Sequence, residues 1–176
     1  MKDSLNFLKS SIRSINDYPK KGIIYRDITT LLKDPQAFSL TIDMCSQYVP
    51  EDVSIIAAID ARGFIIGSAI AQKLNKGFVP IRKKNKLPYK VISQKYDLEY
   101  GTDELELHID SIDIGQKVVL VDDILATGGS ANAAIKLINQ LGADILSIIF
   151  LIELVGLGGR QILEKNNSSI HSIIKF

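Results

Sequence analysis

The stretch Val118-Val-Leu-Val-Asp-Asp-Ile-Leu-Ala-Thr-Gly-Gly-Ser130 decides the fold predicted for this chain. Val118 to Val121 is a fully apolar run, which is typical of a central strand buried on both faces. A helix is expected from about Ala131 to Leu141, ending at Gly142, and Ile145 to Leu151 is expected to form a second buried strand. Strands separated by helices of this length pair in parallel, so this region predicts an α/β sheet.

The same alternation of strand and helix extends toward the amino terminus. Ile55 to Ile59 is a short apolar strand candidate, and a helix is expected from about Phe64 to Leu74, closed by Gly77. Phe78 to Ile81 is the next strand candidate, and the basic run Arg82 to Lys86 is expected to be a solvated loop. The predicted fold is therefore α/β, a doubly wound and mainly parallel sheet flanked by helices.

The remaining segments are less regular. Hydrophobic residues at spacings of three and four predict an amphipathic helix over Ser4 to Ile15, and Ile23 to Tyr25 is expected to be extended. A helix from about Pro35 to Tyr48 follows, with Asp34 as its N-cap. The segment from Val91 to His108 is polar, and Glu104 to Ile109 at its end alternates as a half-exposed strand does.

Composition and charge exclude several classes of protein. The chain has 176 residues, 46% of them hydrophobic, and its 21 basic and 20 acidic residues leave a net charge of +1. This composition is typical of a globular protein, and the small net charge gives no general attraction for nucleic acid or an anionic membrane. No apolar run approaches the roughly 20 residues of a membrane span, and the amino-terminal stretch lacks the apolar block of a signal peptide. We therefore expect a cytoplasmic protein without nucleic-acid or membrane partners, in which the single cysteine, Cys45, is a small buried residue.

The candidate ligand-binding residues follow the strand that begins at Val118. Asp122 and Asp123 stand at the end of this strand, and Thr127, Gly128 and Gly129 lead directly into a helix. Consecutive small residues let backbone N–H groups point into one cavity, where the helix dipole favours an anion such as phosphate. Two carboxylates beside a phosphate would repel it unless they faced ribose hydroxyls or a magnesium ion shared with the substrate. The pattern predicts a phosphorylated sugar as the ligand.

Other phosphate-binding and acidic motifs fit less well. An apolar strand followed by Asp and Gly is also a common structural turn, so the prediction depends on the whole run. The chain contains neither the Gly-Lys-Ser or Gly-Lys-Thr of a Walker loop nor the Gly-x-Gly-x-x-Gly of a dinucleotide-binding fold. Response-regulator receivers carry paired acids at their first strand, and too few residues follow Asp123 for the rest of such a domain.

The run from Val118 to Ser130 resembles the phosphoribosyl-diphosphate (PRPP) motif of type I phosphoribosyltransferases. Three further motifs in the same order are similar to the adenine phosphoribosyltransferase family: Tyr18 to Thr29, Ile59 to Phe64, and Leu98 to Glu106. The resemblance covers about Ile12 to Phe176. It implies transfer of a phosphoribosyl group from PRPP to adenine with Mg²⁺, giving AMP and pyrophosphate, usually in a homodimer.

The resemblance also implies an organisation for the chain. Residues 1–176 would form one phosphoribosyltransferase domain. Within it, about 1–34 would be a small amino-terminal hood that contributes to the base pocket, and about 87–103 would be a flexible lid loop over the catalytic site.

The roles of individual residues follow from the same resemblance. Asp122 and Asp123 would bind the ribose hydroxyls. The 5-phosphate would be held by the backbone amides of Ala126, Thr127, Gly128, Gly129 and Ser130. Pyrophosphate would be bound by a loop expected to contain a cis peptide before Ala61 and by a basic stretch that partly reaches the partner subunit: Asp60, Ala61, Arg62, Lys83, Lys84 and Lys86. No protein side chain is expected to bind the magnesium directly, because PRPP would hold most of it.

The base pocket and the catalytic groups are assigned in the same way. Adenine would be bound by Tyr25, Arg26, Asp27 and Leu154. Glu99 would exchange a proton with the base, and Arg62 would stabilise the departing pyrophosphate. Two residues depart from the family pattern, since Lys21 stands where proline is frequent and Tyr25 stands where phenylalanine is common.

Plainer alternatives exist for several of these residues. Glu99 could be an ordinary surface acid, and the lysines could form a merely solvated loop. His108 and His171 are expected to be solvent-facing or structural. Two other functions remain open at this level: a nonenzymatic regulator that uses a PRPP-binding fold, and a transferase for guanine, hypoxanthine or xanthine.

Overall fold

The computed structural model describes residues 2–97, 101–166 and 168–176. The chain divides into two compact units, Met1–Met44 and Cys45–Phe176. The helix α3 (Pro35–Ser46) runs across the boundary between them. No helix in these described ranges is long and apolar enough to cross a membrane.

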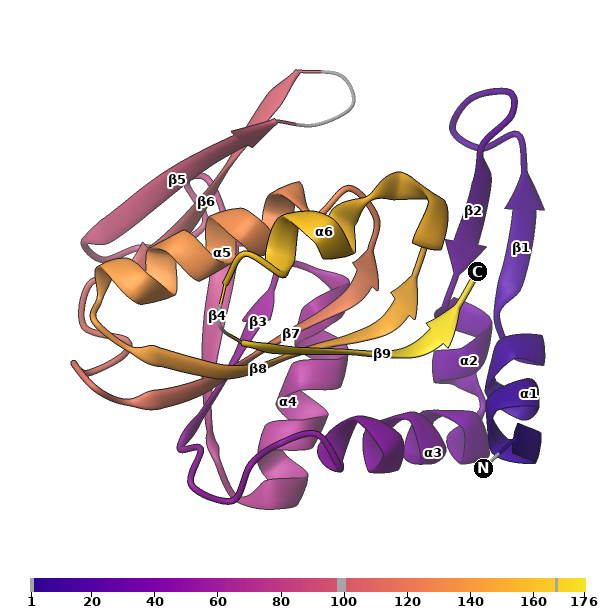
Figure 1. The fold of residues 1–176 in the computed structure, drawn as a ribbon, viewed down its shortest axis with the longest axis horizontal. Coiled ribbons are helices and arrows are strands. Elements are labelled where there is room, and N and C mark those ends of the chain that lie inside the picture. The colour runs from indigo at the N-terminus through magenta and orange to yellow at the C-terminus, as the bar shows by residue number, and fades with distance from the viewer. Residues whose placement is uncertain (1, 98–100, 167) are drawn as a thin grey trace. The chain divides into compact units, whose positions relative to one another are not determined.

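The larger unit is built on a seven-stranded sheet with the strand order β5-β6-β4-β3-β7-β8-β9 (Figure 1). The five strands from β4 to β9 pair in parallel, whereas β6 is antiparallel to both β4 and β5. The strands span the following residues: β3 Ile55–Ile59, β4 Gly77–Lys83, β5 Val91–Asp97, β6 Thr102–His108, β7 Lys117–Leu125, β8 Asp144–Glu153 and β9 Ser169–Lys175. The predicted doubly wound, mainly parallel α/β fold is confirmed.

Helices cover both faces of this sheet (Figure 1). The helix α4 (Arg62–Leu74) lies on one face, and α5 (Gly129–Gln140) and the short α6 (Gly159–Leu163) lie on the other, with a 3-10 turn η1 (Val155–Leu157) before α6. Because side chains alternate along a strand, Ala57 of β3 belongs to the core under α5, while Ala58 faces α4. A Cβ atom on Gly67 of α4 would lie 2.6 Å from the Ala58 Cβ, so glycine permits this close helix-to-sheet approach.

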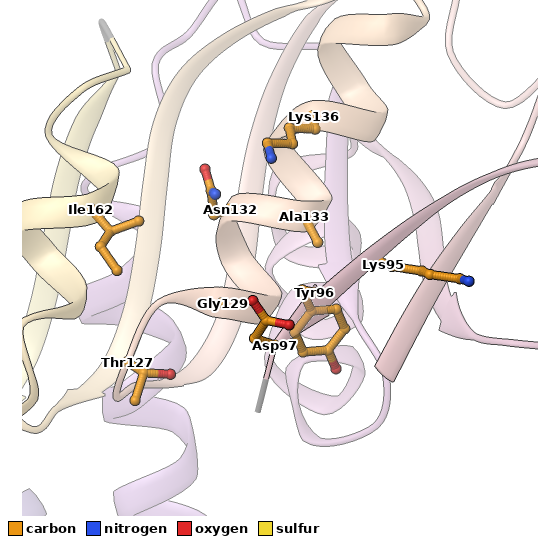
Figure 2. Close-up of a pocket in the computed structure, with 9 residues that line it drawn as sticks. All are labelled: Lys95, Tyr96, Asp97, Thr127, Gly129, Asn132, Ala133, Lys136 and Ile162. Atoms are coloured by element: carbon orange, nitrogen blue, oxygen red, sulfur yellow. The ribbon is translucent and has the colours of Figure 1, made fainter. Parts of the chain in front are cut away.

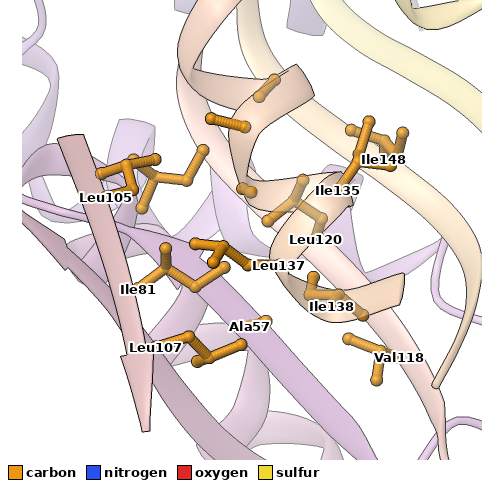
Figure 3. Packing of buried hydrophobic residues seen from close by; sticks show 14 of the residues in the cluster. Ala57, Ile81, Leu105, Leu107, Val118, Leu120, Ile135, Leu137, Ile138 and Ile148 are labelled. Atoms are coloured by element: carbon orange, nitrogen blue, oxygen red, sulfur yellow. The ribbon is translucent and has the colours of Figure 1, made fainter. Parts of the chain in front are cut away.

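The main core lies between the sheet and α5 (Figure 3). Ile135, Leu137 and Ile138 of α5 pack against fully buried residues of the central strands, including Val118 and Leu120. This packing explains why β7 could be recognised as an apolar run, since a strand covered on both faces has little polar surface.

The smaller unit contains two helices and a hairpin before α3. Its elements are α1 (Lys2–Ser10), β1 (Arg13–Asn16), β2 (Ile24–Asp27) and α2 (Thr29–Lys33). The N-cap predicted at Asp34 is confirmed, because its Oδ1 accepts hydrogen bonds from the N–H groups of Gln36 at 2.8 Å and Ala37 at 3.0 Å. The helix predicted over Ser4 to Ile15 is wrong in its second half, where Arg13–Asn16 pairs with β2 instead.

The structure of the middle of the chain also differs from what the sequence predicts. The expected basic loop begins later, since Arg82 and Lys83 belong to β4 and pair with Glu106 and Leu105 of β6. Within the stretch expected as a lid, Val91–Asp97 forms β5, which pairs with β6 from Val91 opposite His108 to Asp97 opposite Thr102; the role of this stretch as a lid stays a prediction. The strand expected to be half exposed is instead buried over Leu105 to Leu107.

Candidate active site

The carboxyl ends of β3 and β7 open into a pocket of about 430 Å³. The two strands are parallel neighbours, with Ala58 opposite Val121, so the residues that follow each of them meet at one edge of the sheet. The pocket is lined by the ends of these strands, the first turn of α5 and part of the β4–β6 region: Ile59, Asp60, Ala61, Arg62, Lys83, Tyr96, Asp97, Asp122, Asp123, Thr127, Gly129 and Ser130. Three segments selected from the sequence therefore converge on one cavity.

The acid pair lies inside the strand, because β7 continues through both aspartates to Leu125. Asp122 is 7% exposed and Asp123 is 4% exposed. Asp122 Oδ1 accepts a hydrogen bond of 2.9 Å from the Asp123 N–H, and the Arg62 guanidinium Nη2 lies 2.8 Å from Asp123 Oδ2. Among the described residues, no donor makes a well-aligned hydrogen bond to Asp123 Oδ2. This buried oxygen is thus suited to accept a hydrogen bond from a bound ligand.

The pKa values of both aspartates are perturbed in the same direction. Burial raises the pKa of Asp122 well above its ordinary value, and the neighbouring Asp123 raises it further. Burial also raises the pKa of Asp123, while Arg62 acts in the opposite direction. Two acids held together out of water are destabilised as anions, so hydroxyl donors or a cation at this position would be favourable.

The loop between β3 and α4 brings Arg62 to the acid pair. Its peptide bond between Asp60 and Ala61 is cis, as expected from the resemblance. Asp60 is held by an ion pair of 3.2 Å from its Oδ2 to Arg82 Nε. A Cβ atom on Gly63 would lie 2.9 Å from Asp122 Oδ1, so the absence of a side chain there lets α4 begin directly beside β7.

The turn from Ala126 to Ser130, called here the phosphate turn, leads into the twelve-residue helix α5. Gly128 adopts a left-handed conformation with φ of 81°, which glycine allows without strain. Among the residues that the structure describes, no side chain caps the start of α5. Because the first N–H groups of a helix have no partner within it and carry the positive end of its dipole, this turn can bind an anion.

The lysines of the basic stretch have different surroundings. The Lys83 ammonium contacts the Tyr96 hydroxyl and the Asp103 carboxylate at the wall of the pocket. Burial lowers the pKa of Lys83, but its hydrogen bonds to Asp103 and Tyr96 outweigh burial and raise the pKa above its ordinary value. Lys84 instead pairs with Glu104 at 2.7 Å, and neither Lys84 nor Lys86 lines this pocket.

A second cavity of about 420 Å³ adjoins the first (Figure 2). Tyr96 and Asp97 of β5 lie beside Gly129, whereas the Lys95 side chain points away from the turn. A Cβ atom on Gly129 would be 2.9 Å from the Asp97 carbonyl oxygen and 3.3 Å from the Tyr96 ring. The end of β5 therefore packs on the phosphate turn. The sequence offered no signal for Tyr96 or Asp97 beyond their place within the expected lid.

Several residues singled out from the sequence are not brought together by these contacts. Tyr25, Arg26 and Asp27 belong to the smaller unit and Leu154 to the larger one, so their joint role in base binding stays a prediction. Asp27 is engaged locally, since hydrogen bonds from Arg13 and from the Thr29 N–H lower its pKa to about 2. Glu99 lies outside the described residues.

Three other predictions concern groups away from the pocket. Cys45 is fully buried, as expected, and burial raises its pKa to about 12. His171 stacks on Tyr48 with ring centroids 4.2 Å apart, and His108 Nε2 accepts a hydrogen bond of 3.4 Å from the Tyr89 N–H. In the described part of the chain, no cluster of three or more His, Cys, Asp or Glu side chains could hold a metal ion.

Comparison with known proteins identifies the family. The phosphoribosyl transferase domain model matches residues 27–172. A protein of Methylorubrum populi named adenine phosphoribosyltransferase is 52% identical over 170 residues, which cover 96% of this chain and 94% of that protein. The chain belongs to the adenine phosphoribosyltransferase family. A relative from Neorhizobium galegae with the same name is also 52% identical, over 97% of this chain.

Solved structures of adenine phosphoribosyltransferases share the fold. The enzyme of Thermoanaerobacter pseudethanolicus superposes with a TM-score of 0.92 at 48% identity, covering 98% of this chain and 99% of its own. The enzyme of Saccharomyces cerevisiae, solved with adenine and an imino-altritol bisphosphate, gives a TM-score of 0.89 at 34% identity over 99% of this chain and 100% of its own. These matches cover the whole site described above.

Proposed function

We propose that this chain transfers the 5-phosphoribosyl group of PRPP to adenine, giving AMP and pyrophosphate in purine salvage. The observation that carries this proposal is one pocket that joins an uncapped helix start, a buried acid pair and an arginine loop. PRPP presents a phosphate, two ribose hydroxyls and a pyrophosphate in the same molecule, and each has a suitable counterpart there. Membership of the family and the adenine complex of the yeast relative support adenine as the acceptor.

The phosphate and the ribose are assigned to neighbouring parts of β7 and α5. The amides of the phosphate turn, Ala126 to Ser130, hold the 5-phosphate, because they form the uncapped positive end of α5. Asp122 and Asp123 accept hydrogen bonds from the ribose 2- and 3-hydroxyls. Asp123 Oδ2 supports this assignment: in the described part of the chain it has the ion pair with Arg62 but no well-aligned hydrogen-bond donor, so a ribose hydroxyl can supply one.

Pyrophosphate is assigned to the loop that follows β3 in the same pocket. Asp60, Ala61 and Arg62 form its loop, and Lys83 faces the same cavity. A planar guanidinium suits two phosphate oxygens at once, which favours Arg62 for this contact. Lys84 and Lys86 do not line the pocket of the single chain, so we propose that they act across a homodimer.

The site fits a substrate that carries magnesium. Asp122 and Asp123 are two buried carboxylates with raised pKa values, and a hard divalent cation near them would offset their repulsion toward a phosphorylated ligand. We propose that the oxygens of PRPP hold most of the metal. When bound, Mg²⁺ supplies positive charge that stabilises the pyrophosphate leaving group.

The residues of the chain then act on a transition state with oxocarbenium character at the anomeric carbon. Arg62 stabilises the negative charge that develops on pyrophosphate as its bond to the sugar breaks. Asp122 and Asp123 hold the ribose while the base attacks, so that the anomeric carbon is already positioned and oriented for the reaction. Closing of the segment around 87–103 excludes water and prevents hydrolysis of the sugar.

The base contacts and the proton transfer rest on the resemblance alone. Tyr25, Arg26, Asp27 and Leu154 would surround adenine, and Glu99 would exchange a proton with N7 as N9 attacks. Replacing Glu99 with Gln should lower kcat at least tenfold while the affinity for PRPP changes less than twofold. Steady-state kinetics with both substrates varied would measure this, and an unchanged kcat would dismiss the role.

One assay tests the proposed function directly. The protein would be incubated with PRPP, Mg²⁺ and each of adenine, guanine, hypoxanthine and xanthine, and nucleotide formation followed by chromatography. AMP formation from adenine alone is expected. Product from guanine or xanthine with none from adenine would overturn the assignment and leave a different purine transferase in its place.

A further inference from the structure

The phosphate turn packs backbone against backbone on the first turn of α6. The Gly159 N–H donates a hydrogen bond of 3.1 Å to the Ala126 carbonyl oxygen. A Cβ atom on Gly159 would lie only 2.2 Å from that oxygen and 2.9 Å from the Gly128 nitrogen. Likewise, a Cβ atom on Gly128 would lie 2.9 Å from the Gly159 carbonyl oxygen. The two turns can approach this closely only because both positions are glycine.

The first turn of α6 is in turn anchored to the sheet. The Arg160 guanidinium donates two hydrogen bonds to Glu153, from Nε at 2.8 Å and from Nη2 at 2.7 Å. The same side chain also reaches β9, where Nη2 lies 3.1 Å from Ser172 Oγ and Nη1 lies 3.3 Å from the Ile170 carbonyl oxygen. A bidentate pair of this kind fixes orientation as well as distance. Arg160 therefore holds Gly159 at a set position behind the turn.

We infer that Gly159 is a positioning residue for the phosphate turn, and that Arg160 fixes it in place. Neither residue lines the pocket, so neither is proposed to touch the substrate. By binding the Ala126 carbonyl, Gly159 fixes the backbone at the start of the turn, from which Thr127, Gly129 and Ser130 reach the pocket lining. The inference deepens the proposed function, since it rests on the assignment of this turn to the 5-phosphate.

The principal test is Gly159→Ala, with Gly156→Ala as a matched control. Gly156 lies in the same connection, is exposed, and has no atom within 4 Å of an added Cβ. Dissociation constants for AMP and for adenosine would be measured by calorimetry, because these ligands differ only in the 5-phosphate. Gly159→Ala is expected to weaken AMP binding at least tenfold and adenosine binding less than twofold, while Gly156→Ala changes neither.

The outcomes separate a positioning role from a structural one. If Gly159→Ala keeps its circular dichroism and binds AMP like the control, the inference is overturned. It is also overturned if AMP and adenosine weaken by the same factor, since a general loss of folded protein would do that. If the unaltered protein itself does not prefer AMP to adenosine, the proposed phosphate site is wrong and the inference fails with it. This failure is distinguishable because it is seen without any substitution.

A second variant covers the case in which Gly159→Ala does not fold. Arg160→Lys keeps the positive charge but loses the bidentate fork, and it adds no atom near the phosphate turn. We expect a smaller change in the same direction, about a threefold loss of AMP affinity with adenosine unaffected. An AMP-to-adenosine ratio unchanged in folded Arg160→Lys would overturn the inference in that case.

Discussion

Buried carboxylates lie near the carboxyl ends of two neighbouring strands, and their surroundings shift their pKa values in opposite directions. On β7, burial and mutual repulsion raise the pKa of Asp122, and burial raises that of Asp123. On β8, Glu153 is 3% exposed, yet its hydrogen bonds to Arg160 outweigh burial and lower its pKa. Glu153 sits opposite Leu125 in the register of the two strands, within a few residues of the acid pair.

The difference shows what distinguishes an acid kept for a ligand from one kept for the fold. Glu153 has both oxygens bound by one arginine fork, and Lys175 lies 3.9 Å away. Asp123 has an ion pair with Arg62 but, within the described residues, no well-aligned donor on Oδ2. Burial alone would not separate the two cases. The number and geometry of the hydrogen-bond donors separate them, because a buried carboxylate with well-aligned donors on both oxygens is structural, whereas one with room for a further donor can bind a ligand.

The largest effect is expected from neutralising the acid pair. The double replacement Asp122→Asn with Asp123→Asn should lower kcat/KM for PRPP about 1000-fold, because ribose hydroxyls lose charged acceptors in the transition state. Thermal stability should not fall, since two repelling buried acids are removed. Enzyme kinetics and a thermal melt would measure both. Asp144→Asn, an exposed acid at the start of β8, is the control.

A double variant that retained activity within a few fold of the parent would show that Asp122 and Asp123 are not needed to bind the ligand. A large drop in melting temperature would instead show the acids to be structural. The control variant should change neither quantity.

The second largest effect is expected from Glu153→Gln. Breaking a buried ion pair leaves the Arg160 charge without its partner, so the free energy of unfolding should fall by about 3 kcal/mol. Urea titration followed by circular dichroism would measure it. Turnover of the folded fraction should fall less than tenfold, since Glu153 does not line the pocket. A change in stability below about 0.5 kcal/mol would show that this pair resembles an exposed one.

The sequence predicted the elements whose signal is local. The strand Ile55–Ile59 matches its predicted bounds, because a short apolar run followed by Asp60 indicates a strand without knowledge of the neighbouring strands. The strand beginning at Lys117 runs past its apolar part through Asp122 to Leu125, because backbone pairing with β8 continues where the side chains become polar. The aspartates were thus found, but their place within the strand was not.

Elements that depend on distant partners were missed or misassigned. The strand Val91–Asp97 is polar and is defined by pairing with β6 rather than by its own pattern. The residues Arg13–Asn16 continue the helical spacing of α1, yet pairing with Ile24–Asp27 decides their structure. Gly159 shows the same limit at the site, because nothing near it in sequence indicates contact with Ala126.

The third prediction uses pH to separate the two groups of acids. The folded pKa values of Asp122 and Asp123 lie above the ordinary 3.8, so the folded state holds extra protons and this contribution to stability falls as pH rises beyond that value. The folded pKa of Glu153 lies below the ordinary 4.5, so its contribution is present above pH 4.5 and is lost as pH falls through the folded value.

Urea titrations at several pH values would test these signs on the two variants. The stability advantage of the Asp122→Asn, Asp123→Asn double variant over the parent should grow as pH rises from about 4. The deficit of Glu153→Gln should shrink as pH falls below 4.5. Parallel curves for parent and variants would show that these groups titrate alike in the folded and unfolded chain.

The smallest effect is expected from Lys175→Ala. This variant tests whether Glu153 is stabilised by its hydrogen bonds to Arg160 or only by nearby positive charge. The Lys175 Nζ lies 3.9 Å from Glu153 Oε2, and its side chain is 59% exposed. An exposed ammonium at this distance contributes little, so the free energy of unfolding should change by less than about 0.5 kcal/mol. Arg160→Lys, which keeps a cation near Glu153 but removes the fork, should cost more than Lys175→Ala in the same urea titration. If the two variants lose equal stability, Glu153 needs only nearby positive charge. The contrast with Asp123 would then depend on the amount of charge and not on satisfied hydrogen bonds.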